Sequence, residues 1–312
     1  MRTTYSRDLF FLSLLIAALA PFRLLHADTL YGVNQYGAVY DLNNIVNGTT
    51  TIGSLVRPSI PGTIQGEVVG TVRSIEYVNN SFIVGAQQLS VNTNRKGKLF
   101  QFGIAQGGEQ FIGKIGVGTT YYYSPLALAK NAQGDLYMSF STTAADRADT
   151  IGKVNPANAQ IDQSTIKTAN PSTVAYHMDG MAFDSSGALF AASTNYPASN
   201  PGTAFFNFSL TNGAITPYCS GSACWSTPGG ATAVAINQST NVKMVARNIG
   251  GGNTEFYRLD LTTSPYTTTL VYLGKIEAVW IVGLTYGADV VPPFPPSREC
   301  DYKVINGVTV CL

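Results

Sequence analysis

The chain has 312 residues, of which 45% are hydrophobic and only 12% are charged, about half the roughly 25% charged share of an ordinary soluble domain. Its 31 Gly, 15 Pro and 17 Tyr are typical of short strands joined by turns, and they argue against long charged helices. A formal net charge of +1 excludes a strongly basic protein, so we expect no nucleic-acid partner. Composition therefore predicts an all-β protein.

The first 27 residues are typical of a secretory signal. Arg2 and Arg7 precede an apolar run over 9–20 that is too short to span a bilayer, and Ala27 offers a small residue for cleavage. No later apolar stretch approaches the length of a membrane span, so we expect export without membrane insertion. The product would be secreted and extracellular, or periplasmic in a bacterium. We predict three segments: a signal peptide over 1–27, a folded domain over 28–289 and a tail over 290–312.

The tail begins with a proline-rich linker over 290–296. Beyond it, the chain alternates around Asn306 and Gly307, a pair typical of a hairpin turn. With these two residues as the loop, Cys311 faces Tyr302 across the hairpin. A bond between Cys311 and Cys300 would therefore need a bulge or a frayed end.

All four cysteines follow the signal segment, and their even number in an exported chain favours disulfides. Proximity favours Cys219 with Cys224 and Cys300 with Cys311, while the other two connectivities stay open. A zinc site is disfavoured, because the spacings are wrong and one histidine alone remains after cleavage.

A short hydrophobic strand recurs five times along the chain. Its copies begin at intervals of 52 to 55 residues, at 30–33, 82–85, 136–139, 189–192 and 244–247. A second strand follows each copy, at 40–43, 100–102, 152–155, 206–208 and 257–260. Strands with small residues precede the first set, and a fourth strand follows the second set, as at 50–53, 110–113 and 271–274. Four-stranded units in tandem at about 50 residues predict the blades of a β-propeller.

The two ends of the folded domain complete one blade. The first copy has strands two to four over 30–55 but no first strand, whereas the last copy is a lone first strand over 280–286. Pairing these segments closes the ring and leaves no unprotected sheet edge. We therefore predict a five-bladed β-propeller of four-stranded blades, with small residues on the first strands where the blades converge at the axis.

One blade carries a motif that can be compared with known repeats. The segment Gly180-Met181-Ala182-Phe183-Asp184-x-x-Gly187-x-Leu189-Phe190 resembles the repeat of NHL-type and gluconolactonase-like propellers, which implies the propeller fold. Gluconolactonase-like enzymes hold a metal in the channel on acidic and amide side chains. Here the position of Asp179 is taken by Arg73, Thr232 and Val282 in other blades, and blade three is ambiguous. We therefore expect no metal site and no cofactor.

The channel mouth offers one candidate pair for catalysis. His177, the only histidine after the signal segment, precedes Asp179 by two residues, so on a strand both side chains share a face. No Gly-x-Ser-x-Gly elbow accompanies them, and a structural hydrogen bond is the alternative role. The carboxylates near first strands share no level in the repeat, so we expect them to be solvated or locally paired rather than a glycosidase pair. These carboxylates are Asp179, Glu67, Glu76 and Glu277.

Aromatic residues gather on the loops that enter the first strands, and these loops share one rim of the predicted ring. The candidate binding residues are Tyr121, Tyr122, Tyr123, Tyr176, Trp225 and Trp280. Such a rim suits sugars, whose apolar faces stack on aromatic rings, and it also suits a protein partner; packing beneath the loops is the alternative. We expect a non-catalytic binding or surface-structural propeller whose partner is a glycan or an extracellular glycoprotein. The alternative hypothesis is an extracellular hydrolase or lactonase with its site at the channel mouth.

Overall fold

The computed structural model describes most of the folded domain and a short hairpin of the tail. The described residues are 28–43, 45, 49–50, 54–87, 96–143, 149–169, 178–193, 204–219, 231–263, 266–288, 302–305 and 308–311. The predicted signal peptide lies outside this set, and so do His177, Tyr176, Trp225, Cys224 and Cys300.

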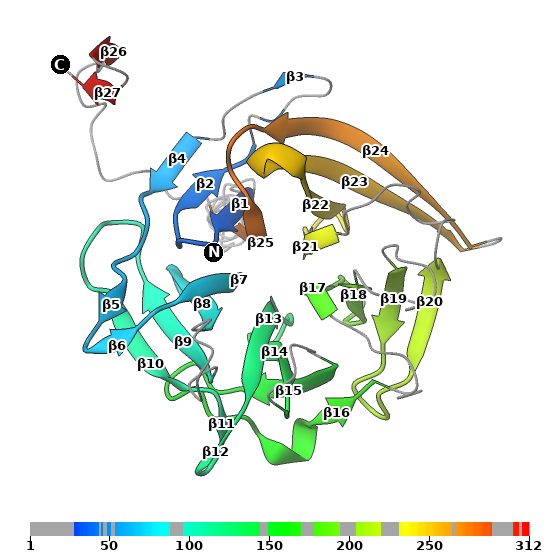
Figure 1. Ribbon diagram of the computed structural model, residues 1–312. Helices are drawn as coiled ribbons and strands as arrows, with labels where there is room; N and C mark the ends of the chain where they lie inside the picture. Colours follow the sequence, from blue (N-terminus) through cyan, green and yellow to red (C-terminus); the bar gives the residue numbers. More distant parts are fainter. Residues whose placement is uncertain are drawn as a thin grey trace, which may run out of the picture.

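Five antiparallel four-stranded sheets surround a central axis, as predicted from the repeats (Figure 1). Blade 1 consists of β25 (Ile281–Gly287), β1 (Thr29–Asn34), β2 (Val39–Asp41) and β4 (Ser54–Arg57). Blade 2 consists of β7 (Thr71–Val78), β8 (Ser81–Gln87), β9 (Gly97–Phe102) and β10 (Gln110–Lys114). Blade 3 consists of β13 (Tyr123–Lys130), β14 (Leu136–Ser141), β15 (Thr150–Val154) and β16 (Lys167–Thr168).

Blade 4 consists of β17 (Met178–Phe183), β18 (Leu189–Ser193), β19 (Ala204–Phe208) and β20 (Ile215–Cys219). Blade 5 consists of β21 (Ala231–Ile236), β22 (Lys243–Ile249), β23 (Asn253–Thr263) and β24 (Tyr266–Ile276). The innermost strands, β25, β7, β13, β17 and β21, contact one another around the axis (Figure 1). Among the described residues, no helix is long and apolar enough to cross a membrane.

The closure of the ring follows the prediction. The C-terminal strand β25 pairs antiparallel with β1, and its partners include Leu30 with Tyr286 and Gly32 with Leu284. Blade 1 therefore combines segments from both ends of the domain, so the ring is held by hydrogen bonds between strands far apart in sequence. Trp280, which we predicted to begin this strand, lies just before it.

The fourth strand of blade 1 differs from the prediction. We placed it at 50–53, but the strand that pairs with β2 is β4, whose Leu55 faces Tyr40. The short strand β3 (Thr49–Thr50) pairs in parallel with β24 instead, with Thr49 opposite Gly274. The connection between β2 and β4 of blade 1 thus adds a fifth strand to blade 5, and this pairing ties the first and last blades together on the outside of the ring.

Each innermost strand contains a register shift close to the axis. In blades 2, 4, 5 and 1 the skipped residue is Arg73, Asp179, Thr232 and Val282, respectively. These are the positions that the sequence aligned. The shift in blade 3 ends at Ala127, which makes Leu126 the equivalent residue and removes the ambiguity. Bulges re-aim side chains, and here they recur at one level of the channel.

Small residues directly follow the bulges: Ser74, Ala127, Gly180, Ala233 and Gly283. A Cβ atom on Gly180 would lie 2.7 Å from the backbone nitrogen of Val234, and one on Gly283 would lie 2.9 Å from that of Ile75. The close approach of neighbouring inner strands therefore requires glycine at these two positions. The rest of the core fills the wedges between blades, largely with Phe, Ile and Val.

Short additional elements decorate the ring. Two small hairpins, β5 (Thr63–Ile64) with β6 (Glu67–Val68) and β11 (Gly116–Val117) with β12 (Thr120–Tyr121), lie in the connections of blades 1 to 2 and 2 to 3. Two 3-10 turns, η1 (Gln163–Thr165) and η3 (Gly250–Gly252), complete the described connections. In the tail, β26 (Tyr302–Ile305) pairs with β27 (Val308–Cys311), and Tyr302 faces Cys311 as predicted.

Candidate functional site

An apolar layer closes the middle of the channel. We call it the apolar plug, and it consists of Ile75, Leu128, Met181, Val234 and Leu284, one residue from each inner strand. All five side chains are buried, and a cavity of only about 10 Å³ remains among this layer and the residues next to it. The two ends of the channel are therefore separate sites.

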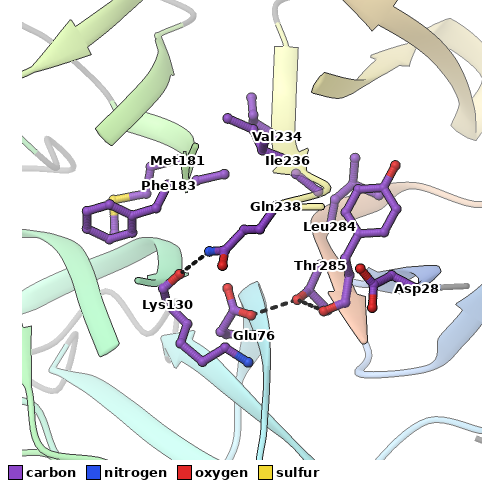
Figure 2. Close-up of a pocket in the computed structure, with 13 residues that line it drawn as sticks. Asp28, Glu76, Lys130, Met181, Phe183, Val234, Ile236, Gln238, Leu284 and Thr285 are labelled. Carbon is purple, nitrogen blue, oxygen red and sulfur yellow. Dashed lines mark hydrogen bonds between the residues drawn. The ribbon is translucent and has the colours of Figure 1, made fainter. Parts of the chain in front are cut away.

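Beyond the plug, the channel opens into a cavity of about 160 Å³, which we call the axial pocket (Figure 2). The next residue of each inner strand explains why this space exists. It is small in four blades, as Ala129, Ala182, Ala235 or Thr285, and it is Glu76 in blade 2. The pocket is lined by Asp28, Glu76, Lys130, Met181, Ala182, Phe183, Val234, Ala235, Ile236, Gln238, Leu284, Thr285 and Tyr286.

Hydrogen bonds from two inner strands fix the carboxyl group of Glu76. The Thr285 hydroxyl donates to Oε1 at 2.8 Å, and the backbone N–H of Tyr77 donates to the same oxygen at 3.0 Å. In Figure 2 the carboxyl group points into the pocket, toward Gln238. Because β25 supplies Thr285, the ring closure itself orients Glu76.

Burial raises the pKa of Glu76 to about 7. The nearby Lys130 ammonium and the hydrogen bonds from Thr285 and Tyr77 act in the opposite direction, but they do not offset the loss of water. A carboxyl group with this pKa both donates and accepts protons near neutral pH, which is uncommon for Glu. Groups perturbed in this way concentrate at functional sites.

Lys130 and Gln238 extend the polar side of the pocket. The Lys130 ammonium donates to the backbone carbonyl of Tyr77 at 2.5 Å, and this hydrogen bond holds the ammonium near the C-terminal end of β7. The Gln238 amide nitrogen donates to the backbone carbonyl of Lys130 at 3.1 Å, so its amide oxygen is available to a ligand (Figure 2). The pocket thus presents a carboxyl, an ammonium and an amide above an apolar floor.

Asp28 and Tyr286 form the remaining polar wall. Burial, together with the charge of Asp28, raises the pKa of Tyr286 to about 12, so its hydroxyl remains a hydrogen-bond donor at neutral pH. Asp28 lies on the Thr285 side of the pocket (Figure 2). Within the described part of the chain, no group of three His, Cys, Asp or Glu side chains is placed to hold a metal ion.

The described member of the predicted catalytic pair, Asp179, lies at the opposite end of the channel. Asp179 is the bulged residue of β17, two positions before the plug residue Met181, and it is half-buried. His177 is outside the described residues, so its relation to Asp179 stays a prediction. Asp179 does not line the axial pocket.

The described aromatic residues of the predicted rim play different roles. Tyr122 stacks on Phe140 with ring centroids 4.7 Å apart and packs against the core, which matches the alternative of packing beneath the loops. Tyr121 accepts the Lys96 ammonium over its ring at 4.3 Å, and Tyr123 pairs with Ser141 at the start of β13. Trp280 is 45% exposed. In the described part of the chain, no ring contact joins Trp280 to the three tyrosines.

The glutamates predicted near the first strands fall into two groups, those in ion pairs and one that faces the axial pocket. Glu67 pairs with Lys98 at 3.0 Å and with Lys114 at 3.2 Å, and Glu277 pairs with Lys275 at 3.1 Å, which confirms the expected local pairing. The same expectation was wrong for Glu76, which no ion pair engages among the described residues and which faces the axial pocket. Its partly exposed side chain stands in the space that small residues leave open, where it accepts hydrogen bonds from Thr285 and Tyr77 and pairs with no cation among the described residues.

The cysteine predictions lie largely outside the described residues. Cys224 and Cys300 are among the residues left out, while Cys219 and Cys311 are placed only as backbone at the ends of β20 and β27. The hairpin register does place Cys311 opposite Tyr302, so the expectation that a bond to Cys300 needs a distorted end still holds. Both disulfides remain predictions.

The fold defines the class of this protein as a five-bladed β-propeller, and comparisons with solved structures agree. A GH43 β-1,3-galactosidase with galactodeoxynojirimycin matches at TM-score 0.53 and 8% identity, over 80% of this chain and 87% of that one. A glucose dehydrogenase matches at 0.45 and 11%, over 78% and 84%. Regucalcin from Agrobacterium tumefaciens, a calcium-binding protein, matches at 0.41 and 12%, over 69% and 63%. The likeness to the galactosidase shows the fold alone. No family model and no curated protein matches the sequence.

Proposed function

We propose that this protein is an exported binding propeller that holds one sugar residue of a glycan in the axial pocket. The observation that carries the proposal is a pocket with an apolar floor and a ring of mixed hydrogen-bonding groups at the end of a closed channel. Its volume of about 160 Å³ suits one six-membered ring, because an apolar cavity of roughly 150 Å³ in another protein admits benzene.

The chemistry of the walls matches the two faces of a sugar. Met181, Val234 and Leu284 supply an apolar floor for the C–H face of a pyranose ring. Glu76, Lys130 and Gln238 surround that floor with groups that accept from and donate to hydroxyls. Polar groups that converge on a pocket fix the orientation of a small ligand bound there.

A binding experiment with matched variants tests this proposal. We would titrate the exported domain with a panel of monosaccharides and methyl glycosides by calorimetry, using the parent chain, Glu76→Gln and Glu277→Gln. The control residue Glu277 is an exposed carboxylate paired with Lys275. We expect saturable binding that weakens at least tenfold in Glu76→Gln and is unchanged in Glu277→Gln. Binding that is insensitive to Glu76→Gln would overturn the assignment to this pocket.

A glycoside hydrolase is the second candidate, because two carboxyl groups, Glu76 and Asp28, line the same pocket. A carboxyl group with a pKa of about 7 is suited to protonate a leaving group, and a second carboxylate is suited to activate water or attack the sugar. The GH43 galactosidase named above is an enzyme of this kind, although its likeness to this chain extends to the fold only. Sugar release that is lost in both Glu76→Gln and Asp28→Asn, with binding retained, would replace the binding role by catalysis.

Export is part of the proposal and rests on the charged and apolar pattern of residues 1–27. Cleavage after Ala27 would make Asp28, a residue of the axial pocket, the first residue of the mature chain. Intact-mass measurement of the protein recovered outside the cytoplasm should give a chain that begins at Asp28. Recovery of the full-length chain from the cytoplasm alone would contradict this part.

A further inference from the structure

A cavity of about 400 Å³ lies at one end of blade 3, outside the channel. We call it the blade 3 cavity. Its walls come from the turn before β14, from β14 and β15, and from the segment that follows β15. They include Asp135, Leu136, Lys153, Val154, Ile161 and Asp162. The cavity shares no lining residue with the axial pocket, so it is a separate site.

The size and the surface of the blade 3 cavity suit a small organic molecule. Most of its surface is apolar, and Leu136, Val154 and Ile161, which belong to the core next to blade 3, line it. Small-molecule sites are typically cavities of roughly 300 to 1,000 Å³ with a mainly apolar lining and a few polar groups. An apolar cavity of roughly 150 Å³ admits benzene, so this one has room for a ring with a short chain.

Backbone hydrogen bonds fix the wall that follows β15. The N–H of Asp162 donates to the carbonyl of Lys153 at 2.9 Å. The N–H of Ile161 donates to the carbonyl of Gly116 at 2.7 Å, which ties the wall to the hairpin of β11 and β12. A wall that is already ordered loses little conformational freedom when a ligand binds.

Three charged side chains line the cavity. The Lys153 ammonium lies 2.7 Å from Oδ1 of Asp135, and this hydrogen bond holds the pKa of Asp135 below its usual range. Hydrogen bonds from Ser164 lower the pKa of Asp162 in the same way. Both carboxyl groups are therefore ionised at neutral pH. Two negative charges stand against one positive charge, so the cavity favours a cation over an anion.

The two carboxylates act on one part of the cavity. Burial raises the pKa of Tyr137, and the charges of Asp135 and Asp162 raise it further, whereas Lys153 acts in the opposite direction. Both carboxylates are thus within electrostatic reach of one hydroxyl group. Oδ1 of Asp162 accepts the N–H and the hydroxyl of Ser164 at 3.0 and 2.7 Å. Its Oδ2 accepts no hydrogen bond from the described residues, so it is available to a ligand.

We propose that the blade 3 cavity binds a small organic cation of the arylalkylammonium class. The ring contacts the apolar walls, and the ammonium group donates to Oδ2 of Asp162 with Asp135 nearby. This proposal does not depend on the sugar site. Pairs of exposed charges contribute modestly, so we expect an ammonium ligand to bind about fivefold more tightly than a neutral ligand of the same shape.

Three ligands of nearly the same shape test the proposal: 2-phenylethylammonium, 2-phenylethanol and phenylacetate. We would measure their affinities by calorimetry at low and high salt, and record spectra of carbon-13-labelled methyl groups during the same titrations. Val154 and Ile161 line the blade 3 cavity, whereas Val234 and Leu284 line the axial pocket and serve as internal controls.

We expect 2-phenylethylammonium to bind most tightly and phenylacetate most weakly, with a smaller difference at high salt. Val154 and Ile161 should shift, while Val234 and Leu284 should not. No shift at Val154 and Ile161 with any of the three ligands would overturn the site, and so would shifts confined to Val234 and Leu284. Equal affinity for the ammonium ion and the alcohol, or tighter binding of phenylacetate, would overturn the assignment to a cation.

A matched pair of variants tests the role of Asp162. Asp162→Asn removes the charge and keeps an oxygen that accepts from Ser164, and Asp260→Asn is the control at an exposed aspartate that pairs with Arg258 in blade 5. We expect the preference for the ammonium ion over the alcohol to fall below about twofold in Asp162→Asn and to stay at about fivefold in Asp260→Asn. Both variants should melt cooperatively. A preference that survives in Asp162→Asn would contradict the proposal.

Discussion

The two ends of the channel differ in how the sequence builds them. At the end where the inner strands begin, the described candidates are aromatic residues such as Tyr122 and Trp280, of which one packs in the core and the other is exposed. At the opposite end, a single Glu76 stands among small residues and creates a polar pocket. The apolar plug separates the two ends.

In this protein, a residue that departs from the repeat indicates the candidate site better than the abundance of one residue type does. Aromatic residues are common in this chain and serve the core, the blade interfaces and the surface alike. Glu76 stands at a level of the inner strands that the other four blades fill with Ala or Thr. Its carboxyl group therefore does not pack in the core or between blades as the aromatic residues do. The pocket end therefore carries the functional assignment, and the following predictions test it.

The largest expected effect is the loss of the whole fold when the closing strand is removed. Ending the chain at Lys275 deletes β25 with the buried side chains of Ile281 and Leu284, which pack in the core between blades 5 and 1. Each such loss costs about 2 to 5 kcal/mol, comparable with the total stability of a domain. We expect no cooperative thermal transition. Ending the chain before Pro292 should leave the melting temperature unchanged, and equal behaviour of the two truncations would contradict the closure.

The second effect is a pH dependence that belongs to the pocket end. The pKa of Glu76 is raised from 4.5 to about 7 in the folded protein, so the folded state retains a proton that the unfolded chain releases. The contribution of Glu76 to the free energy of unfolding is therefore fully present below about pH 4.5. It is lost as the pH rises through about 7, which lowers the stability of the domain by on the order of 3 kcal/mol. Urea unfolding at pH 5 and pH 8 should show this loss in the parent chain and much less of it in Glu76→Gln. The Glu277→Gln control should behave like the parent, and a Glu76→Gln variant with the parent's pH profile would refute the prediction.

A third effect concerns the packing that keeps the two ends apart. In Gly283→Ala the new Cβ would lie 2.9 Å from the backbone nitrogen of Ile75, which cannot move without shifting β7. We expect a loss of about 1 to 3 kcal/mol in the free energy of unfolding. Gly62→Ala, where nothing lies within 4 Å of the added atom, should change stability by less than about 0.5 kcal/mol. Equal effects of the two substitutions would argue against close packing at the axis.

The smallest effect is expected at the other end of the channel. Trp280→Ala removes a side chain that is 45% exposed and should change stability by about 0.5 kcal/mol. Tyr122→Ala removes a ring stacked on Phe140 and should cost about 2 kcal/mol or more. Comparison of the two melting temperatures separates a surface aromatic from a core aromatic. A larger loss from Trp280→Ala would show that the exposed rim is structural.

The sequence was sufficient for the architecture because repetition is visible without a structure. The recurring strands fall inside β1, β8, β14, β18 and β22, and the split blade follows from the unmatched strands at the two ends. The fourth strand of blade 1 was misplaced, because Thr49 and Thr50 form a strand with a different blade, and pattern within one repeat does not reveal pairing between repeats.

The site was harder to predict for a related reason. Alignment of the inner strands already placed Glu76 level with Ala182, but a lone carboxylate in a repeat is more often solvated. Glu76 becomes part of a site because Thr285, Gln238 and Asp28, which come from three other segments, line the same pocket. Those contacts arise only when the ring closes, so no spacing in the sequence encodes them.

We propose that a ligand binds at the pocket end of the channel and not at the aromatic rim. The most direct measurement is a pair of binding isotherms for the same glycoside, one with Glu76→Gln and one with Trp280→Ala, each compared with the parent chain. We expect at least a tenfold loss of affinity in Glu76→Gln and no change in Trp280→Ala. A loss of affinity confined to Trp280→Ala would contradict the account and return the site to the other end of the channel.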